Sequence, residues 1–186
     1  GKYRSQWAYI GDSLVIRNVF HTAEGSVSLT DALMFEPGSR GHTIGRRVPH
    51  VLLRRVQGIE GETDMDMEFR PRMEYGMTAP RYQSTDRGWN IVGGPVELDL
   101  IAGVPLELTG DSIRARFRIG AGQSSEFSLA YRAPGCGVPD RDIDVPLSIE
   151  DTVAAWHSWA DLHTGYQALY REKVRRSALV LQGLPY

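Results

Sequence analysis

The sequence predicts a mainly β fold, an antiparallel β-sandwich followed by two C-terminal α-helices. Apolar and polar residues alternate with a period of two over residues 13–132, turn-forming residues interrupt this pattern at short intervals, and the spacing becomes helical after residue 147. A period of two places successive side chains on opposite faces of a strand. Many short strands without intervening helices are typical of antiparallel sandwiches.

The strand pattern is clearest at residues 113–119, where four apolar residues alternate with Arg114, Arg116 and Arg118. No amphipathic helix has this spacing. The expected strands cover residues 14–22, 26–33, 50–56, 64–70, 89–92, 96–101, 105–108, 113–119 and 127–131. The expected turns between them cover residues 23–25, 60–61, 93–95, 110–111 and 120–122.

Two segments are expected to be loops. Residues 36–49 are rich in glycine and arginine, and residues 133–146 contain three prolines and two glycines. The second loop is interpreted as a linker because the spacing changes directly after it. The domain organisation expected from this change is a sandwich over residues 1–134, a linker over 135–147 and helices over 148–186.

Ser148 is expected to cap a helix over residues 148–162, because a serine hydroxyl accepts hydrogen bonds from the free amides of a first helical turn. Trp156 and Trp159 lie three residues apart on one side of this helix, which is therefore expected to bury aromatic surface. A second helix is expected over residues 166–184. Its apolar residues recur at helical spacing, namely Leu169, Tyr170, Val174, Ala178, Leu181 and Leu184.

The composition is that of a globular chain, with 41% hydrophobic and 24% charged residues in a length of 186. No segment reaches the roughly 18 to 20 apolar residues that a membrane span needs, so a membrane is not an expected partner. A net charge of −2 argues against a nucleic-acid partner, which requires a clustered basic surface. Cys136 is the only cysteine, which excludes an intramolecular disulfide and favours a reducing, cytoplasmic location.

Five segments in order along the whole chain resemble the N-terminal region of glycoside hydrolase family 15, the family of bacterial glucoamylases, glucodextranases and trehalases. They are YIGDSLV at 9–15, LTDAL at 29–33, HVLLRRVQG at 50–58, RPRMEYG at 70–76 and VRRSALVLQGL at 174–184. The resemblance implies a trehalase-like β-sandwich domain of supersandwich-like fold that precedes an (α/α)6 catalytic barrel of the same polypeptide. A linker helix joins the two, and the last segment is the first helix of that barrel.

Family chemistry, as the resemblance implies it, is inverting hydrolysis of α-glucosidic bonds by two glutamates of the barrel. No residue of this sequence matches them, so no catalytic residue and no cofactor are expected in this chain. Family members carry several dozen residues before the segment that begins at Tyr9. In the family these residues form early strands of the sandwich. Without such strands, sheet edges and core would be exposed and would favour self-association.

Asp64, Asp66 and Glu68 share one face of an expected strand, where three carboxylates could hold a cation or act as paired acids. The alternative is that they face solvent and pair across the sheet with Arg114, Arg116 and Arg118. The histidines are scattered and lack the convergent spacing of metal ligands, so no metal site is expected. They are His21, His42, His50, His157 and His163.

The loop at residues 36–49 loosely resembles an anion-binding loop through its glycines and arginines, namely Gly38, Arg40, Gly41, Gly45, Arg46 and Arg47. It lacks the Gly-Lys-Ser/Thr ending of a phosphate loop, and an inter-strand loop or a domain-docking loop is preferred. Cys136 has no neighbouring base in the sequence that would activate it as a nucleophile.

Trp7, Tyr82 and Trp89 are the candidate substrate-binding residues, because flat aromatic faces can stack on sugar rings. For Trp89, and for Tyr75, core packing is favoured over stacking. The expected function is therefore a non-catalytic domain that packs on and supports the catalytic barrel. The alternative is a carbohydrate-binding module for α-glucans, and the substrate of the parent enzyme, trehalose or an α-glucan, stays open.

Overall fold

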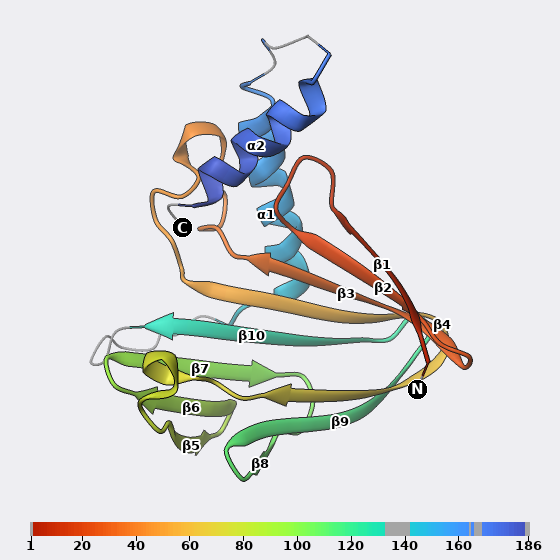
Figure 1. Ribbon diagram of the computed structural model, residues 1–186, viewed down its shortest axis with the longest axis vertical. Helices are drawn as coiled ribbons and strands as arrows, with labels where there is room; N and C mark the ends of the chain where they lie inside the picture. The colour runs from red at the N-terminus through yellow and green to blue at the C-terminus, as the bar shows by residue number, and fades with distance from the viewer. Residues whose placement is uncertain (1, 133–141, 164, 166–168, 185–186) are drawn as a thin grey trace.

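The computed structural model describes residues 2–132, 142–163, 165 and 169–184, and shows a β-sandwich with two helices at one end (Figure 1). The helices are α1 (Val145–Ala160) and α2 (Arg171–Gly183), and short 3-10 helices lie at Gly41–Thr43 and Met73–Gly76. The strands are β1 (Arg4–Tyr9), β2 (Ile16–His21), β3 (Gly25–Leu33), β4 (Val51–Phe69), β5 (Arg81–Thr85), β6 (Gly88–Gly93), β7 (Val96–Ala102), β8 (Glu107–Thr109), β9 (Ser112–Gly120) and β10 (Ser124–Arg132). The predicted fold class is confirmed.

A large antiparallel sheet has the strand order β1-β2-β3-β4-β10-β7-β6-β5. The 19-residue strand β4 links it to a second, smaller sheet. The first half of β4 pairs with β3 on one side and β10 on the other, whereas its second half pairs with β9, which in turn pairs with β8. The smaller sheet lies over one face of the larger one, and this makes the sandwich (Figure 1).

The space between the two sheets holds two apolar clusters. One contains the buried side chains of Val27, Val56, Ile119 and Phe127, and the other contains those of Met73, Ile91, Leu100 and Ile113. In β9 the residues at 113, 115 and 119 are buried, while Arg116 and Arg118 are exposed. The alternation predicted for residues 113–119 is therefore confirmed.

A glycine lets β4 pass from one sheet to the other. Gly61 has a φ of +62°, and a Cβ atom built on it would lie only 2.1 Å from the carbonyl oxygen of Glu24. Neither the φ value nor the space suits a residue with a side chain. The turn expected at residues 60–61 is wrong, because the chain bends at this glycine and continues as a strand.

Helix α1 covers the face of the large sheet opposite to the smaller sheet. Trp156 and Trp159 are buried in a cluster that includes Val51 and Leu53 of β4, which confirms the expected burial of aromatic surface. The predicted cap at Ser148 is wrong. Asp144 caps the helix instead by accepting a 3.0 Å hydrogen bond from the amide of Leu147, and α1 begins inside the predicted linker at Val145.

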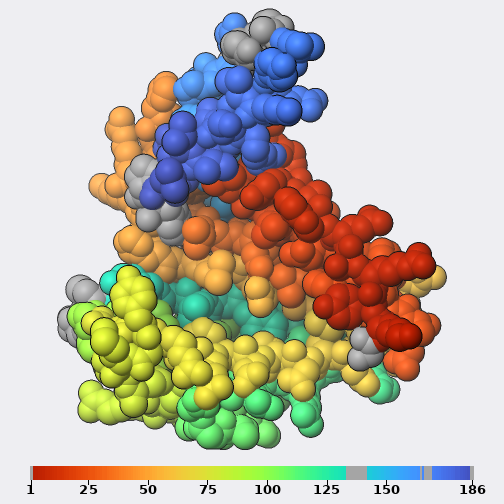
Figure 2. Space-filling model, viewed as in Figure 1, coloured from red at the N-terminus to blue at the C-terminus, as the bar shows by residue number. Residues whose placement is uncertain are grey.

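Helix α2 begins at Arg171, later than the expected start, and ends at Gly183. Figure 2 shows it on the surface beside the β1–β2 segment. The expected helix start at residues 166–168, most of the expected linker and Cys136 lie outside the described residues. Neither described helix is long and apolar enough to cross a membrane.

Strands β1 and β5 were not expected from the sequence, and they form the two ends of the large sheet. Most residues of both strands are exposed, so the apolar alternation that marks the inner strands is weak in them. Each strand pairs on one side only within the described part of the chain. Self-association through such edges stays a prediction.

Candidate functional site

The turn between β1 and β2 contacts both helices. The hydroxyl of Ser13 donates a hydrogen bond to the carbonyl of Ile10 at 2.6 Å and accepts one from the amide of Val15 at 3.1 Å. Ser13 is fully buried. Gly11 has a φ of +56°, and a Cβ atom there would lie 2.6 Å from Nε2 of His157 on α1. The turn can approach α1 this closely because residue 11 is glycine.

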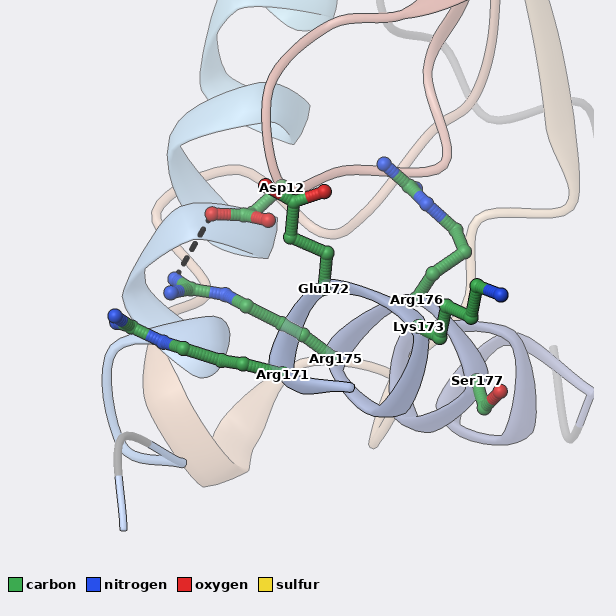
Figure 3. A pocket seen from close by; sticks show the side chains of 7 residues that line it. All are labelled: Asp12, Arg171, Glu172, Lys173, Arg175, Arg176 and Ser177. Carbon is green, nitrogen blue, oxygen red and sulfur yellow. Dashed lines mark ion pairs between the residues drawn. The ribbon is translucent and has the colours of Figure 1, made fainter. Parts of the chain in front are cut away.

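Arg175 ties α2 to this turn and to α1. Its Nη2 lies 3.0 Å from Oδ2 of Asp12 in the turn (Figure 3). The same Nη2 lies 3.3 Å from Oδ1 of Asp161 at the end of α1. Its side chain is 20% exposed, which is low for an arginine. One side chain therefore joins three segments of the chain.

Arg176 makes a second anchor beside the first. It donates to the carbonyl of Ser13 at 2.5 Å and to that of Gly11 at 3.1 Å, and its guanidinium lies 4.3 Å from the centre of the Tyr9 ring. A guanidinium over an aromatic face is attractive. The surface recess of about 760 Å³ beside these arginines is lined mainly by side chains of α2, as Figure 3 shows.

The loop between β3 and β4 also docks on α1. The amides of Gly38 and Gly41 donate to Asp151 Oδ2 and Ser158 Oγ, both at 2.8 Å, and Arg40 Nη2 lies 2.5 Å from Asp151 Oδ1. Side chains of α1 thus accept hydrogen bonds from two of the amides to which an anion could otherwise bind. The loop therefore docks on helix α1 of the same chain.

The contacts of Asp151 predict how this loop responds to acid. Burial alone would raise the pKa of Asp151, but hydrogen bonds from Arg40 and from the amide of Gly38 outweigh it and hold the pKa below its usual value. Since the folded-state pKa is the lower one, the stabilisation is complete above the unfolded pKa near about 3.9 and is lost as pH falls through the folded value. We expect Arg40→Ala to raise the pKa of Asp151 in a carboxyl NMR titration. An unchanged pKa in this variant would contradict the assignment, and Arg46→Ala in the same loop is the control.

The outer face of α2 carries a second apolar stripe. Its exposed members are Val174 and Leu181 of α2 and the flanking cap residues Tyr170 and Leu184, with exposed fractions of 43%, 66%, 58% and 72% respectively. With Ser177 in the middle, their spacing alternates between four and three residues, as at the seam of a coiled coil. Leu179 on the opposite side of the helix is fully buried. Helix α2 can therefore pack against the sandwich and against a further helix at the same time.

The acidic and basic faces of β4 and β9 meet as expected. Asp64, Asp66 and Glu68 lie opposite Arg118, Arg116 and Arg114 in the strand register. The shortest nitrogen-to-oxygen distances are 2.7, 3.1 and 2.8 Å respectively. The hypothesis of cross-strand pairing is confirmed. Solvent screens exposed pairs of this kind, so each contributes little to stability.

The candidate sugar-stacking residues do not converge. Trp7 lies on β1 and is 64% exposed, whereas Tyr82 and Trp89 lie on β5 and β6 at the other end of the large sheet. Tyr82 donates to the carbonyl of Asp111 at 2.6 Å and Trp89 donates to that of Leu106 at 3.5 Å, and both pack on the inner cluster. Tyr75 is fully exposed, so its expected core packing is wrong.

Two histidines that are far apart in the sequence meet in the fold. His42 and His163 have ring centres 6.0 Å apart. Within the described part of the chain, no group of three or more His, Cys, Asp or Glu side chains could hold a metal ion.

Sequence reasoning missed the anchoring residues Asp12, Arg175 and Arg176. A signal for them existed, because two of the five family-like segments, residues 9–15 and 174–184, are the two that meet here. Two adjacent arginines in a largely apolar helical segment need hydrogen-bonding or charged partners when they are partly buried. The sequence did not show that this partner lay about 160 positions earlier.

Comparison with known proteins relates the chain to glycoside hydrolases. It is similar to proteins named trehalase from Mycobacterium tuberculosis, at 27% identity over 199 residues, and from Mycolicibacterium smegmatis, at 26% identity over 198 residues. Both comparisons cover 96% of this chain. A trehalase from Thermoplasma volcanium is 24% identical over 70% of the chain. No family model matches the chain.

These relatives are much longer than this chain. The similarity covers 28% of the M. tuberculosis protein, 29% of the M. smegmatis protein and 21% of the T. volcanium protein. The chain therefore spans less than a third of the length of the trehalases that it resembles.

Proposed function

We propose that this chain is the non-catalytic N-terminal β-sandwich domain of a trehalase- or glucoamylase-like enzyme of glycoside hydrolase family 15, and that it supports the helical catalytic domain of the same polypeptide. The exposed apolar stripe of α2 carries this proposal. Apolar residues with coiled-coil spacing on a helix surface pack against another helix. The greater length of the related trehalases supports a further domain as the source of that helix.

The electrostatics of two described carboxylates, Asp64 and Asp111, do not suit a general acid. A general acid in a glycosidase needs a raised pKa, so that it is protonated at neutral pH. A hydrogen bond from Arg118 lowers the pKa of Asp64, and one from Arg70 lowers the pKa of Asp111. These carboxylates are therefore poor proton donors.

The substrate of the proposed parent enzyme is an α-glucoside, with trehalose favoured by the names of the relatives and α-glucans as the other possibility. A cytoplasmic location is part of the proposal because Cys136 is the single cysteine.

The first test is an activity assay. The purified 186-residue chain is expected to hydrolyse neither trehalose nor maltose, whereas the proposed longer polypeptide with a catalytic domain is expected to hydrolyse one of them. Turnover by the purified chain would refute the non-catalytic role.

A second test addresses the stripe on α2. In the longer polypeptide Leu181→Ala is expected to lower the free energy of unfolding by about 2 kcal/mol, because it opens a cavity under the covering helix. In the 186-residue chain the same side chain is exposed, so the change stays within about 0.5 kcal/mol. Denaturant unfolding of both proteins measures the difference.

Leu108→Ala on β8 is the matched control for this comparison. Leu108 is also partly exposed but lies in the smaller sheet, away from the helices. It should have the same small effect in both proteins. Equal effects of Leu181→Ala in both proteins would rule out α2 as the docking helix.

One observation favours the alternative of a carbohydrate-binding module. Trp7 is largely exposed, and its ring centre lies 5.8 Å from that of Tyr9 in an edge-to-face arrangement that leaves much of the indole in contact with solvent. An exposed indole can stack on a sugar ring. This alternative predicts saturable binding of maltooligosaccharides that Trp7→Ala abolishes.

A further inference from the structure

A hollow of about 400 Å³ opens on the face of the large sheet that carries α1. Its floor is built from aliphatic side chains of three neighbouring strands, including Val51 of β4, Ala130 of β10 and Ile101 of β7. The loop between β3 and β4 forms one wall and contributes Glu36 and Arg47. This volume is at the lower end of the roughly 300–1,000 Å³ of small-molecule sites, so it suits a small ligand.

Asp99 lies in the same row of the floor as Val51 and Ala130, and its carboxylate is held in place from behind. Oδ1 accepts from Asn90 Nδ2 at 2.8 Å and from Arg132 Nη2 at 3.1 Å, while Oδ2 accepts from Arg132 Nε at 2.5 Å. A carboxylate oxygen can accept two hydrogen bonds. Among the described residues Oδ2 receives one, so it can accept another from a ligand hydroxyl.

The charges of the hollow are paired within the protein. Asp99 is paired with Arg132, and Glu36 lies 3.5 Å from Arg47 at the rim. An ionic ligand would have to compete with the partner charge of one of these pairs, whereas a neutral ligand with hydroxyl groups can hydrogen-bond to them. A ligand that also carries an apolar surface would cover the aliphatic floor.

We propose that this hollow binds a single neutral hexopyranose unit, either free or as the end of a disaccharide. The CH face of the ring lies on Val51, Ala130 and Ile101, one hydroxyl donates to Oδ2 of Asp99, and another accepts from Arg47. The choice of a sugar as the ligand rests on the proposed function, since that function brings the domain into contact with glucosides. The hollow is a different place from Trp7, which lies on the edge strand β1.

The test is an NMR and calorimetric titration of the 186-residue chain with glucose, maltose and trehalose, with sorbitol as an acyclic control. We expect saturable binding at millimolar sugar, amide shift changes at residues 99–101 and 128–130, and weaker binding of sorbitol, which has no ring face. Ala130→Phe fills the hollow and is expected to weaken binding at least about tenfold. Arg47→Ala removes one hydrogen bond and is expected to weaken it about threefold. The matched control Arg46→Ala changes the neighbouring arginine, which is not part of the lining, and should leave binding unchanged.

The results that overturn the proposal are distinct. No saturation with any of the three sugars, equal binding of sorbitol, or equal effects of the two arginine variants would each reject it. Binding that is lost in Trp7→Ala and kept in Ala130→Phe would place the sugar on β1 instead. If Ala130→Phe does not fold, the comparison of Arg47→Ala with Arg46→Ala decides whether the sugar binds in the hollow. A chain that binds no sugar, beside a longer polypeptide that hydrolyses trehalose, would reject this site and leave the proposed function standing.

Discussion

Replacing Gly61 by alanine is expected to lower the free energy of unfolding by about 2–5 kcal/mol. The positive φ of +62° at Gly61 contributes about 1–2 kcal/mol of this loss, because a Cβ atom crowds its own backbone there. The clash with the carbonyl oxygen of Glu24, 2.1 Å from the new Cβ, contributes about 1–3 kcal/mol. That oxygen belongs to the backbone of the β2–β3 turn, so it can move only if the strands move. Urea unfolding followed by circular dichroism measures the effect.

Gly110→Ala is a closely matched control. Gly110 has the same φ of +62°, but a Cβ atom added there would meet no other atom within 4 Å. It should therefore show the loss from the backbone conformation, about 1–2 kcal/mol, without the loss from the clash. If the two variants lose the same stability, the close approach at the bend of β4 is not what requires glycine.

Trp156→Ala is expected to destabilise the chain by about 3–5 kcal/mol, the range for removing a large buried aromatic side chain. Trp156 is 4% exposed and lies in the cluster that joins α1 to the large sheet, with its ring centre 5.0 Å from that of Phe35. Its Cη2 also lies close to Gly183 at the end of α2. The loss of this side chain should loosen both helices, and hydrogen exchange should then report faster exchange in α2 as well as in α1.

Leu147→Ala is the control on the same helix. Leu147 is 62% exposed, so its truncation should change stability by no more than about 0.5 kcal/mol. Unchanged exchange rates in α2 of the Trp156→Ala variant would contradict the view that α2 depends on this cluster.

The exposed ladder between β4 and β9 shows how far local sequence patterns reach. Alternation in each segment indicated the two charged faces, and opposite charge made the acidic and basic sets candidate partners. Only the strand register paired Asp64 with Arg118. Opposite charges that face each other on neighbouring strands attract, so the alternation of each segment is consistent with pairing of the two strands. The edge strand β5 was missed because most of its residues are exposed, and exposed strands show no apolar period.

The candidate docking site was predicted in part. The helical spacing of residues 169–184 predicted an apolar helix, and the structure shows that its two sides have different roles. The anchoring of Arg176 on Gly11 and Ser13 could not be predicted, because no local pattern links residues so far apart in the sequence. The hollow is a similar case, since Glu36, Asp99 and Ala130 meet only after three strands and a loop have come together.

Periodicity in the amino-acid sequence was enough to show which side chains are buried and which are exposed along most strands and along α1, because it reports the local backbone conformation and the side that avoids water. It did not show that β4 bends at Gly61 into a second sheet, that α1 begins at Val145 on the opposite face, or that one stripe of α2 stays uncovered. These features depend on close approaches between backbones that are distant in the sequence. Such approaches are set by the packing of the whole chain and leave no periodic signal in any one segment.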